Sequence, residues 1–263
     1  MHKDLSLPGY TYARIYDEVS STMDVARESM PELGLGSGVV CALKQTAGRG
    51  RQGRSWSSPS GAFMATFLHQ GDAPLAAFAG YSLCVGVSLV SVFSRYNASL
   101  QLKWPNDLVV VSNGAIRKVG GILIEVQELH GKRIVLTGIG VNLSDPPVDV
   151  EHATSLKEVS GATLDAETLL PVMAQTLEEN HQRFLSDGGF RAFRTQWEEA
   201  SCFERGESVI SIDLGFQTVS GVFDGVSDTG ALQLRREGRV ETFHSGHILS
   251  VERPRGGHLR RVS

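Results

Sequence analysis

Alternation of apolar and polar residues marks the first elements of the chain. Residues 10–19, YTYARIYDEV, alternate with the period of a half-buried strand. The Ser-Ser-Thr run at 20–22 then offers N-caps for a helix that ends before Pro31. Two apolar runs, 38–43 and 62–68, are predicted strands. The eighteen residues between them form a long, glycine-rich loop, and loops of this length in compact domains usually carry function.

The longest stretch without a charged residue runs from Pro74 to Ser94 and is long enough to cross a bilayer. Its many alanine, glycine and serine residues weaken its apolar character. We therefore predict a helix buried in the protein core and no membrane span.

Further strands and helices follow without regular βα alternation. Strands are predicted at 99–103, 108–112, 119–126 and 133–143, and helices at 166–186 and 190–200. This irregular mixture indicates an α+β fold with a mixed β-sheet.

The pattern changes after Cys202. Residues 206–253 hold about five short strand-like runs separated by glycine-containing turns, which is typical of a small β-barrel. We expect a domain boundary near residue 203, with a larger domain at 1–202 and a smaller one at 203–263. The short basic tail from Arg253 is expected to be a solvated chain end.

Charge and cysteine content narrow the function classes. The 25 Lys and Arg residues against 29 Asp and Glu residues give a formal net charge of −4, so no global basic field favours nucleic acid or an anionic membrane. The three cysteines lie far apart without metal-site spacing, which favours reduced, buried thiols. The N-terminal residues lack the apolar core of a signal peptide, so a cytoplasmic location is the default expectation.

The sequence Gly-Arg-Gly-Arg-Gln-Gly at 48–53 matches the GxGxxG pattern after a strand. A dinucleotide site requires this turn to open directly into a helix, whereas residues 54–61 read as coil. Residues 44–54 carry four cationic side chains and no acid, so the rest of the chain carries a charge of −8. A flexible glycine backbone that bears arginines can surround a phosphate or a carboxylate.

Three other segments have similar chemistry: Lys-Trp-Pro-Asn-Asp at 103–107, Arg-Lys-Val-Gly-Gly at 117–121, and Gly-Ile-Gly-Val-Asn at 138–142. Each alone is compatible with a structural turn or an ordinary strand. Together with the arginine-rich loop they predict one site, with cations for anions, glycines for close approach and amides for polar groups.

In these motifs the sequence closely resembles the biotin protein ligases. The resemblance runs in family order through SST at 20–22, QTAGRGRQGRSW at 45–56, KWPNDL at 103–108, RKVGGILIE at 117–125 and GIGVN at 138–142. It implies an enzyme that adenylates biotin with ATP and Mg²⁺, and then passes biotin to one lysine of a carboxylase's biotin carboxyl carrier domain. It also implies a catalytic domain similar to class II aminoacyl-tRNA synthetases and an SH3-like C-terminal domain.

The resemblance also implies the site residues. Those expected to bind biotin are Ser21, Thr22, Met23, Gln45, Arg49, Gly50, Arg51, Lys118 and Gly121. Those expected to bind ATP or the adenylate are Arg49, Arg51, Trp56, Lys103, Asn106, Lys118 and Asn142. Arg51 and Lys118 can offset the repulsion between a carboxylate and a phosphate, and we expect both to be catalytic. Asp107 is a candidate general base, with a structural turn or a metal contact as alternatives, and no dedicated protein metal site is expected.

The sequence departs from the family at two places. Position 23 is Met where the family usually has Asn, which could alter the edge of the biotin pocket. About a dozen residues precede the matched region, so we expect no winged-helix domain and no operator binding. A lipoate or other acyl-adenylating ligase and a non-catalytic biotin-binding sensor are the alternatives, although GRGRxG favours biotin. The sequence leaves homodimer formation through a sheet edge open.

Overall fold

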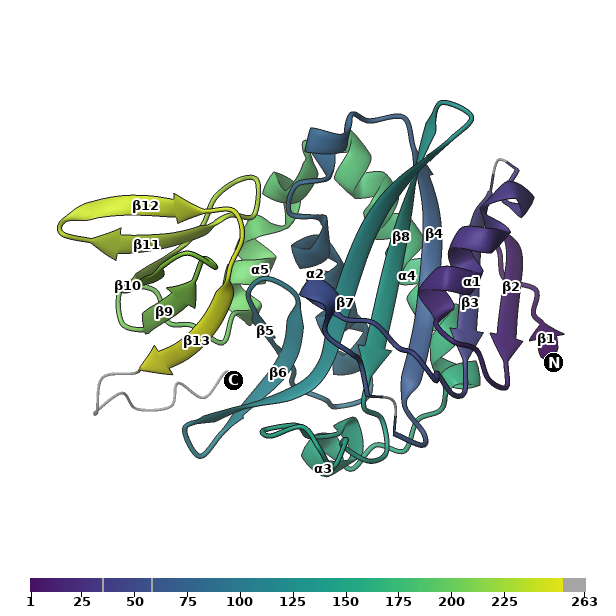
Figure 1. The fold of residues 1–263 in the computed structure, drawn as a ribbon, viewed down its shortest axis with the longest axis horizontal. Coiled ribbons are helices and arrows are strands. Elements are labelled where there is room, and N and C mark those ends of the chain that lie inside the picture. The colour runs from purple at the N-terminus through teal and green to yellow at the C-terminus, as the bar shows by residue number, and fades with distance from the viewer. Residues whose placement is uncertain (35, 58, 253–263) are drawn as a thin grey trace.

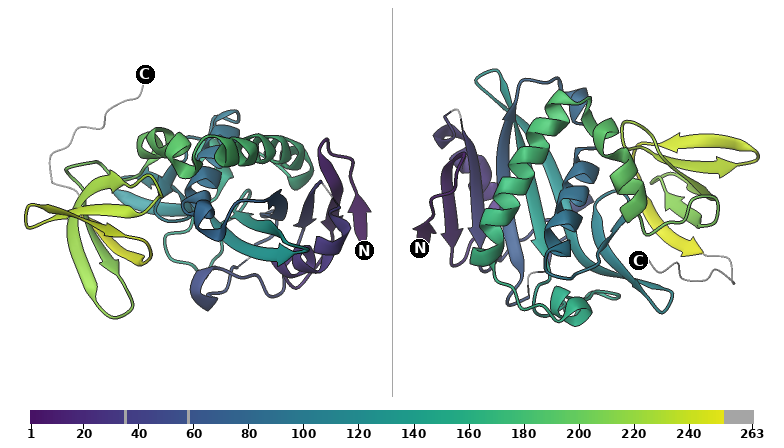
Figure 2. Two further views of the ribbon diagram at one scale, coloured as in Figure 1. Left: turned by 90° about the horizontal axis from the view of Figure 1, so that it is seen from above. Right: turned by 180° about the vertical axis from the view of Figure 1, so that it is seen from behind.

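A computed structural model describes residues 1–34, 36–57 and 59–252 of the chain and arranges them around two β-sheets (Figure 1). Helices α2, α4 and α5 lie on one face of the larger sheet, and α1 lies on the opposite face (Figure 2). The predicted α+β class with a mixed sheet is confirmed.

The larger sheet has eight strands in the order β1-β2-β3-β4-β8-β7-β6-β5. Strands β2 and β3 are parallel, and every other neighbouring pair is antiparallel. The strands are β1 (His2–Asp4), β2 (Tyr10–Tyr16), β3 (Ser37–Ala42), β4 (Phe63–Gly71), β5 (Gln101–Lys103), β6 (Asp107–Ser112), β7 (Ala115–Leu129) and β8 (Lys132–Val141). All the strands predicted in this part of the sequence are present, although β2 ends three residues early and β7 is longer than expected.

Five α-helices accompany the described strands. They are α1 (Thr22–Ser29), α2 (Tyr81–Ser94), α3 (Leu156–Ser160), α4 (Ala166–Ser186) and α5 (Arg194–Ala200). Helix α4 matches its predicted bounds, because Asp165 caps it by accepting a hydrogen bond from the Thr168 backbone N–H at 2.7 Å. The helix predicted at 190–200 begins as a 3₁₀ turn, Gly189–Phe193, and continues as α5.

The apolar stretch predicted as one helix is divided in the structure. A 3₁₀ turn, Leu75–Phe78, and Gly80 at φ +76° precede α2, and a side chain at position 80 would lie 2.7 Å from Phe190. Among the described residues, Leu75–Ser94 is the one segment that passes a length and hydropathy test for a membrane span. Helix α2 itself has 14 residues and is therefore about 21 Å long, less than the roughly 30 Å of a bilayer's hydrocarbon core.

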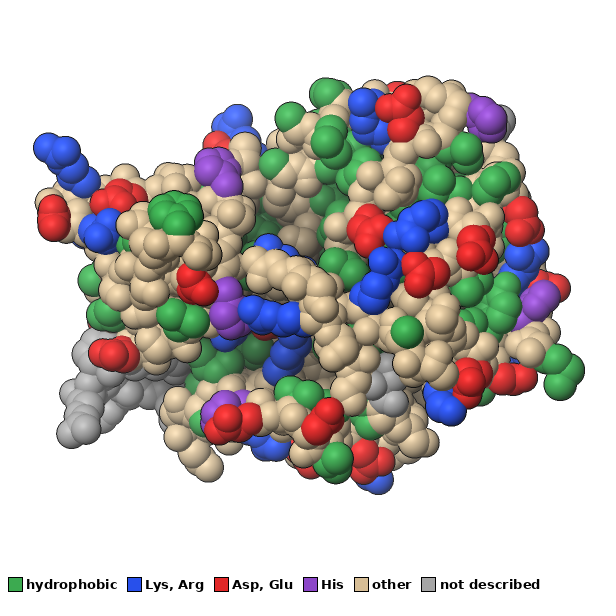
Figure 3. Space-filling view, viewed as in Figure 1, with side chains coloured by type: hydrophobic (Ala, Val, Ile, Leu, Met, Phe, Trp, Pro, Cys, Tyr) green, Lys and Arg blue, Asp and Glu red, His purple; other side chains and the backbone are tan. Residues whose placement is uncertain are grey.

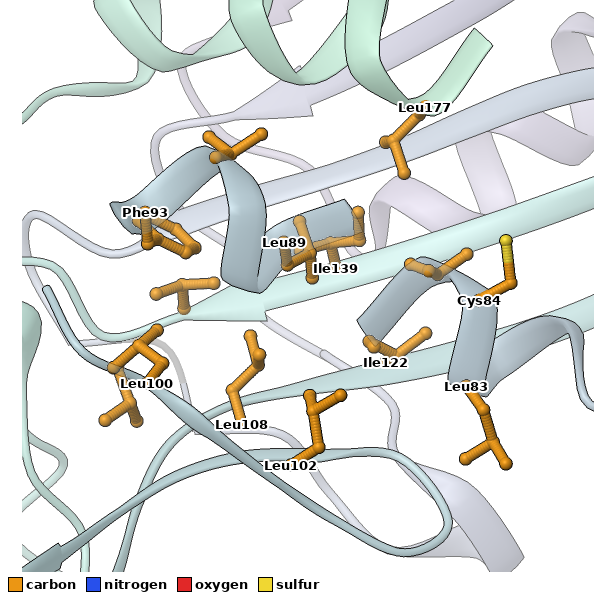
Figure 4. Packing of buried hydrophobic residues seen from close by; sticks show 14 of the residues in the cluster. Leu83, Cys84, Leu89, Phe93, Leu100, Leu102, Leu108, Ile122, Ile139 and Leu177 are labelled. Carbon is orange, nitrogen blue, oxygen red and sulfur yellow. The ribbon is translucent and has the colours of Figure 1, made fainter. Parts of the chain in front are cut away.

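The main core lies between α2, α4 and the larger sheet. Leu89 of α2 lies beside Ile139 of β8, Ile122 of β7 lies nearer to Leu83 and Cys84, and Leu177 points from α4 above them (Figure 4). The prediction of a buried core helix is confirmed, since nine of its residues are buried. The three cysteines are free and buried as predicted, and burial raises the pKa of the Cys41 thiol to about 12.

The five short strands predicted after Cys202 form a second, antiparallel sheet in the order β12-β11-β10-β9-β13. They are β9 (Val209–Asp213), β10 (Thr218–Val226), β11 (Leu232–Arg236), β12 (Arg239–Phe243) and β13 (His247–Glu252). The Trp104 indole N–H donates to the Gly230 carbonyl at 3.0 Å and joins the C-terminal segment to the larger sheet's 103–107 turn. The predicted basic tail lies outside the described residues.

Candidate active site

A cavity of about 150 Å³ opens where the two sheets meet. Lys and Arg side chains and a histidine gather in the hollow between the two lobes (Figure 3). The glycine-rich loop forms one wall, β7 and β8 form the floor, and the start of β13 closes one end. Predicted site residues on its wall are Ser21, Thr22, Met23, Gln45, Arg49, Gly50, Arg51, Trp56, Lys103, Asn106, Asp107, Lys118 and Gly121. The structure therefore brings the four predicted motif segments to one place.

One end of the cavity is polar because α1 begins there. The Thr22 backbone N–H and hydroxyl donate to the Gln45 side-chain oxygen at 2.8 and 3.1 Å, and the Thr66 hydroxyl donates to Thr22 at 2.9 Å. Ser21 occupies the N-cap position, yet its side chain caps no backbone N–H. An N-cap serine normally satisfies the first turn of its helix, whereas this buried hydroxyl does not.

The middle of the cavity is apolar and close to the backbone. Met23 packs over Gly138, where a side chain would approach its Sδ to 2.9 Å. The Trp56 indole lies over Gly140, and a Cβ there would lie 2.5 Å from Cε2. The glycines predicted for close ligand approach therefore accommodate side chains of the protein itself. The Trp56 Nε1 is buried and has no hydrogen-bond partner within the described part of the chain.

Opposite charges meet at the other end. The Lys118 Nζ lies 2.6 Å from the Asp107 Oδ1 and 5.6 Å from the Trp56 ring centroid. A β-bulge shifts the register of β6 against β7 near Leu108. In a regular strand, side chains three positions apart, such as those at 118 and 121, point to opposite faces of the sheet. Here a Cβ added to Gly121 would lie 3.4 Å from the Lys118 Nζ, so the two positions face the same side. The bulge therefore directs Lys118 into the cavity.

Arg51 faces the same end from the loop. Its Nη1 lies 3.4 Å from the Asn106 Oδ1, while the Asn106 amide donates to the Ile122 carbonyl at 2.8 Å. Burial lowers the pKa of the Arg51 guanidinium, and the negative charge of Asp107 opposes that shift. The side chain stays protonated at neutral pH, because an arginine does not lose its proton in proteins.

Arg49 lines the cavity, and its guanidinium group forms ion pairs with carboxylates of the protein. Its Nη2 lies 2.6 Å from the Asp24 Oδ1 on α1 and 3.9 Å from the Glu125 Oε1 on β7. The sequence did not single out Asp24 or Glu125 as partners, because only the fold brings them together.

Asn142, an expected adenylate contact, lies away from the cavity wall. It is 2% exposed, its backbone N–H donates to the Val119 carbonyl, and its side-chain amide donates to the Thr154 carbonyl at 3.0 Å. Its position at the end of β8 turns the side chain toward the segment that borders β7.

The C-terminal sheet supplies residues that sequence reasoning missed: Gly246, His247 and Ile248. The His247 Nδ1 lies 3.5 Å from the Arg54 Nη1. Partial burial lowers the pKa of His247, and the positive charges of Arg54 and Lys103 add to this shift. No local motif marks these residues, which reach the cavity only through the pairing of β13 with β9.

Metal ligands are sparse in this site. Across the described ranges, no group of three or more His, Cys, Asp or Glu side chains could hold a metal ion. Asp107 and Asn106 offer oxygen atoms at the cationic end. This fits a Mg²⁺ ion carried mainly by nucleotide phosphates, which needs only one or two protein carboxylates.

Hydroxyl and amide groups lie at one end of the cavity and cations at the other, an arrangement suited to a molecule with a polar head group and an anionic end. Comparisons with known proteins show the family. The "Biotin/lipoate A/B protein ligase family" profile matches residues 16–144. A "Biotin--[acetyl-CoA-carboxylase] ligase" of Paracoccus denitrificans is 34% identical over 216 residues, which cover 76% of this chain and 85% of that protein.

Two further relatives extend the comparison. The "Bifunctional ligase/repressor BirA" of Escherichia coli is 28% identical over 237 residues, which cover 88% of this chain and 71% of that protein. The solved Aquifex aeolicus biotin protein ligase in complex with biotin and ATP is 28% identical, with a TM-score of 0.73 over 92% of this chain and 98% of that one. This chain belongs to the biotin protein ligase family.

Proposed function

We propose that this protein activates biotin with ATP to form biotinyl-5′-AMP, and then transfers biotin to a specific lysine of a biotin carboxyl carrier domain. One observation carries the proposal: the hydroxyl and amide cluster around Thr22 and the Lys118–Asp107 pair lie in one cavity. Relatives that are named for ligation of biotin to acetyl-CoA carboxylase support this choice of substrate and partner.

The polar end suits the ureido group of biotin, which has both donors and acceptors. Ser21 offers its hydroxyl, while Thr22 and Gln45 form a fixed pair beside it. Met23 borders the apolar ring system, because its thioether adapts to irregular surfaces. We assign Gly50 and Gly121, which line the same cavity, to contact with the valeryl chain.

The cationic end suits the carboxylate and the nucleotide. Arg51 and Lys118 face the reacting groups, and Lys103 and Asn106 line the same end. Trp56 offers an aromatic face for adenine. We assign Asn142 an indirect role, because its amide bonds the carbonyl of Thr154, whose N–H donates to the Lys118 carbonyl at 2.8 Å.

In the first step, a biotin carboxylate oxygen attacks the α-phosphorus of ATP, a new P–O bond forms, and pyrophosphate leaves. Both reactants are anions, so Arg51 and Lys118 reduce their repulsion and stabilise the charge of the transition state. Mg²⁺ supplies charge neutralisation on the phosphates when it is bound. Asp107 holds Lys118 at the cavity wall until the anions arrive.

In the second step, the carrier's lysine amine attacks the biotinyl carbonyl, an amide bond forms, and AMP leaves with the bonding electron pair. The nucleophile belongs to the partner, so this chain needs no nucleophilic side chain. The amine loses a proton, and Asp107 is our candidate for its acceptor.

Several finer features belong to the same proposal. We assign the larger sheet with its helices to a catalytic domain similar to class II aminoacyl-tRNA synthetases, spanning 1–202. We assign 203–263 to an SH3-like barrel. The protein is expected to act in the cytoplasm, without contact with nucleic acid or a membrane. We also propose that a homodimer forms through the edge of β1, whose three residues are exposed.

Exchange of labelled pyrophosphate into ATP tests the first step. The account predicts exchange that depends on biotin and that lipoate neither supports nor inhibits. Exchange driven by lipoate would favour a lipoate ligase. Biotin binding with exchange at background would favour a non-catalytic sensor.

A further inference from the structure

The glycine-rich loop forms a short hairpin between Gly48 and Trp56. The Trp56 N–H donates to the Gly48 carbonyl at 2.9 Å, and the Gly50 N–H donates to the Arg54 carbonyl at 2.7 Å. Residues 49–52 line both the cavity and an adjoining groove of about 670 Å³. This hairpin is therefore the shared wall between the cavity and the groove, and its movement would open the cavity.

One side of the hairpin is tied to the body by a four-residue ion-pair network. Asp24 Oδ1 accepts from the Arg49 Nη2 at 2.6 Å and from the Arg27 Nη1 at 2.9 Å. Arg27 also donates to the Glu125 Oε2 at 2.6 Å. Two guanidinium groups and two carboxylates thus join the hairpin, α1 and β7 with no net charge.

The other side of the hairpin is held more weakly. Its side-chain hydrogen bonds there join Arg51 to Asn106 at 3.4 Å and Arg54 to His247 at 3.5 Å, and its Trp56 ring packs on Gly140. Across residues 1–34, 36–57 and 59–252, Arg49 is the one hairpin side chain in an ion pair with the body. The Asp24–Arg49 contact is therefore the strongest polar tie that keeps the hairpin in place.

Arg49 and Arg51 of the hairpin differ in whether carboxylates neutralise their charge. Arg49 is matched by Asp24 and Glu125, so its charge is largely satisfied before a ligand arrives. Arg51 has no carboxylate within ion-pair distance in the described part of the chain, and it faces the reacting end. Loss of the Asp24 charge should therefore affect hairpin closure more than the chemistry itself.

We propose that Asp24 is a positioning residue: it anchors Arg49, holds the hairpin closed, and thereby retains the biotinyl-5′-AMP intermediate until the carrier arrives. Arg27 and Glu125 assist by fixing Asp24 and the Arg49 head group. This inference rests on the proposed function, since it concerns the intermediate of that reaction.

The test compares Asp24→Asn, which keeps the shape and removes the charge, with wild type and Asp24→Glu. Enzyme loaded with biotinyl-5′-AMP is separated from free ligand, and release of the adenylate without carrier is followed by chromatography. We expect Asp24→Asn to release the adenylate up to about fivefold faster, the size expected for a partly exposed ion pair. The single-turnover rate of adenylate formation should stay within roughly twofold of wild type, and Asp24→Glu should restore retention.

A matched control is Glu32→Gln, which removes the carboxylate paired with Arg14 at 2.7 Å, outside the cavity and the adjoining groove. Its release rate should equal that of wild type. Arg27→Ala is a second variant and should also speed release, because it frees Asp24 from β7.

The outcomes separate two failures. If wild type forms no adenylate, the proposed function is wrong. Suppose instead that wild type forms adenylate, and that Asp24→Asn, with an unchanged melting temperature, releases it at the wild-type rate or more slowly. The role assigned to Asp24 is then wrong, and the proposed function stands.

Discussion

The Lys118 ammonium lies 2.6 Å from the Asp107 carboxylate, and the two residues belong to neighbouring antiparallel strands. Both side chains line the cavity, and a bulge in the pairing of β6 with β7 makes this possible. The pair holds Lys118 at the cavity wall. Under the proposed function, the carboxylate and the phosphate therefore meet a lysine that already lies in the cavity.

Lys118→Ala should lower the rate of adenylate formation on the order of hundredfold or more, because the positive charge acts where negative charges converge. Single-turnover formation of biotinyl-5′-AMP measures this step. The control is Lys44→Ala, which removes an exposed lysine paired with Glu18 outside the cavity. A Lys118→Ala rate close to wild type would remove this residue from the catalytic machinery.

Arg51→Ala should cause a loss of similar order, roughly hundredfold, since its guanidinium is half-buried at the same end of the cavity. Arg51→Lys should restore only part of the rate, because an ammonium lacks the planar pair of donors that fits phosphate. Arg133→Ala, which breaks a long surface pair with Glu128, serves as the control. Equal rates for Arg51→Lys and wild type would argue against paired hydrogen bonds to phosphate.

Gly140→Ala should displace the Trp56 side chain. The added methyl group would lie 2.5 Å from the Trp56 Cε2, so the indole must move. Overpacking of this kind costs about 1–3 kcal/mol of unfolding free energy. In a Trp56→Ala background the same substitution should cost much less, and urea unfolding of the four proteins gives that comparison. An equal cost in both backgrounds would contradict the packing of Trp56 on Gly140.

A second polar cluster, remote from the cavity, makes stability depend on pH. The rings of His69 on β4 and His181 on α4 stack with centroids 4.9 Å apart. His181 Nε2 lies 2.8 Å from the Gln70 carbonyl and must donate, so its Nδ1 accepts from the Tyr81 hydroxyl at 2.8 Å. Burial lowers the pKa of each imidazole below its ordinary value, which favours the neutral form of both rings.

The unfolded chain takes up protons at its histidines below about pH 6.5, whereas these two rings resist protonation in the folded state. Their stabilising contribution is therefore complete above that pH and is lost as the pH falls below it. Glu178, whose Oε2 lies 3.6 Å from the His69 Nε2, opposes the lowering of the His181 pKa without overcoming burial. Urea midpoints should fall between about pH 7.5 and pH 5. His181→Gln should weaken this dependence and the exposed His130→Gln should leave it unchanged; a wild-type midpoint equal at both pH values would contradict the account.

Local patterns predicted most of the fold. Alternation and capping located β2, α1 and α4, since those signals depend on neighbouring residues. The division before α2 was missed because it depends on Phe190, which packs against Gly80 from far along the chain.

The candidate site shows the same limit. The motif residues around Gln45, Arg51 and Lys118 were predicted to converge and do so. The sequence could not reveal that Asp24 would pair with Arg49, or that His247 would reach the cavity, since each contact depends on how distant strands and helices pack.

Transfer of biotin to a carrier tests the central claim most directly. The protein is incubated with biotin, ATP, Mg²⁺ and a biotin carboxyl carrier domain, and the carrier is then analysed by mass spectrometry. The account predicts one covalent biotin on a single lysine, dependent on ATP and absent when that lysine is replaced by arginine. A carrier of unchanged mass, from a protein that still binds biotin, would contradict it.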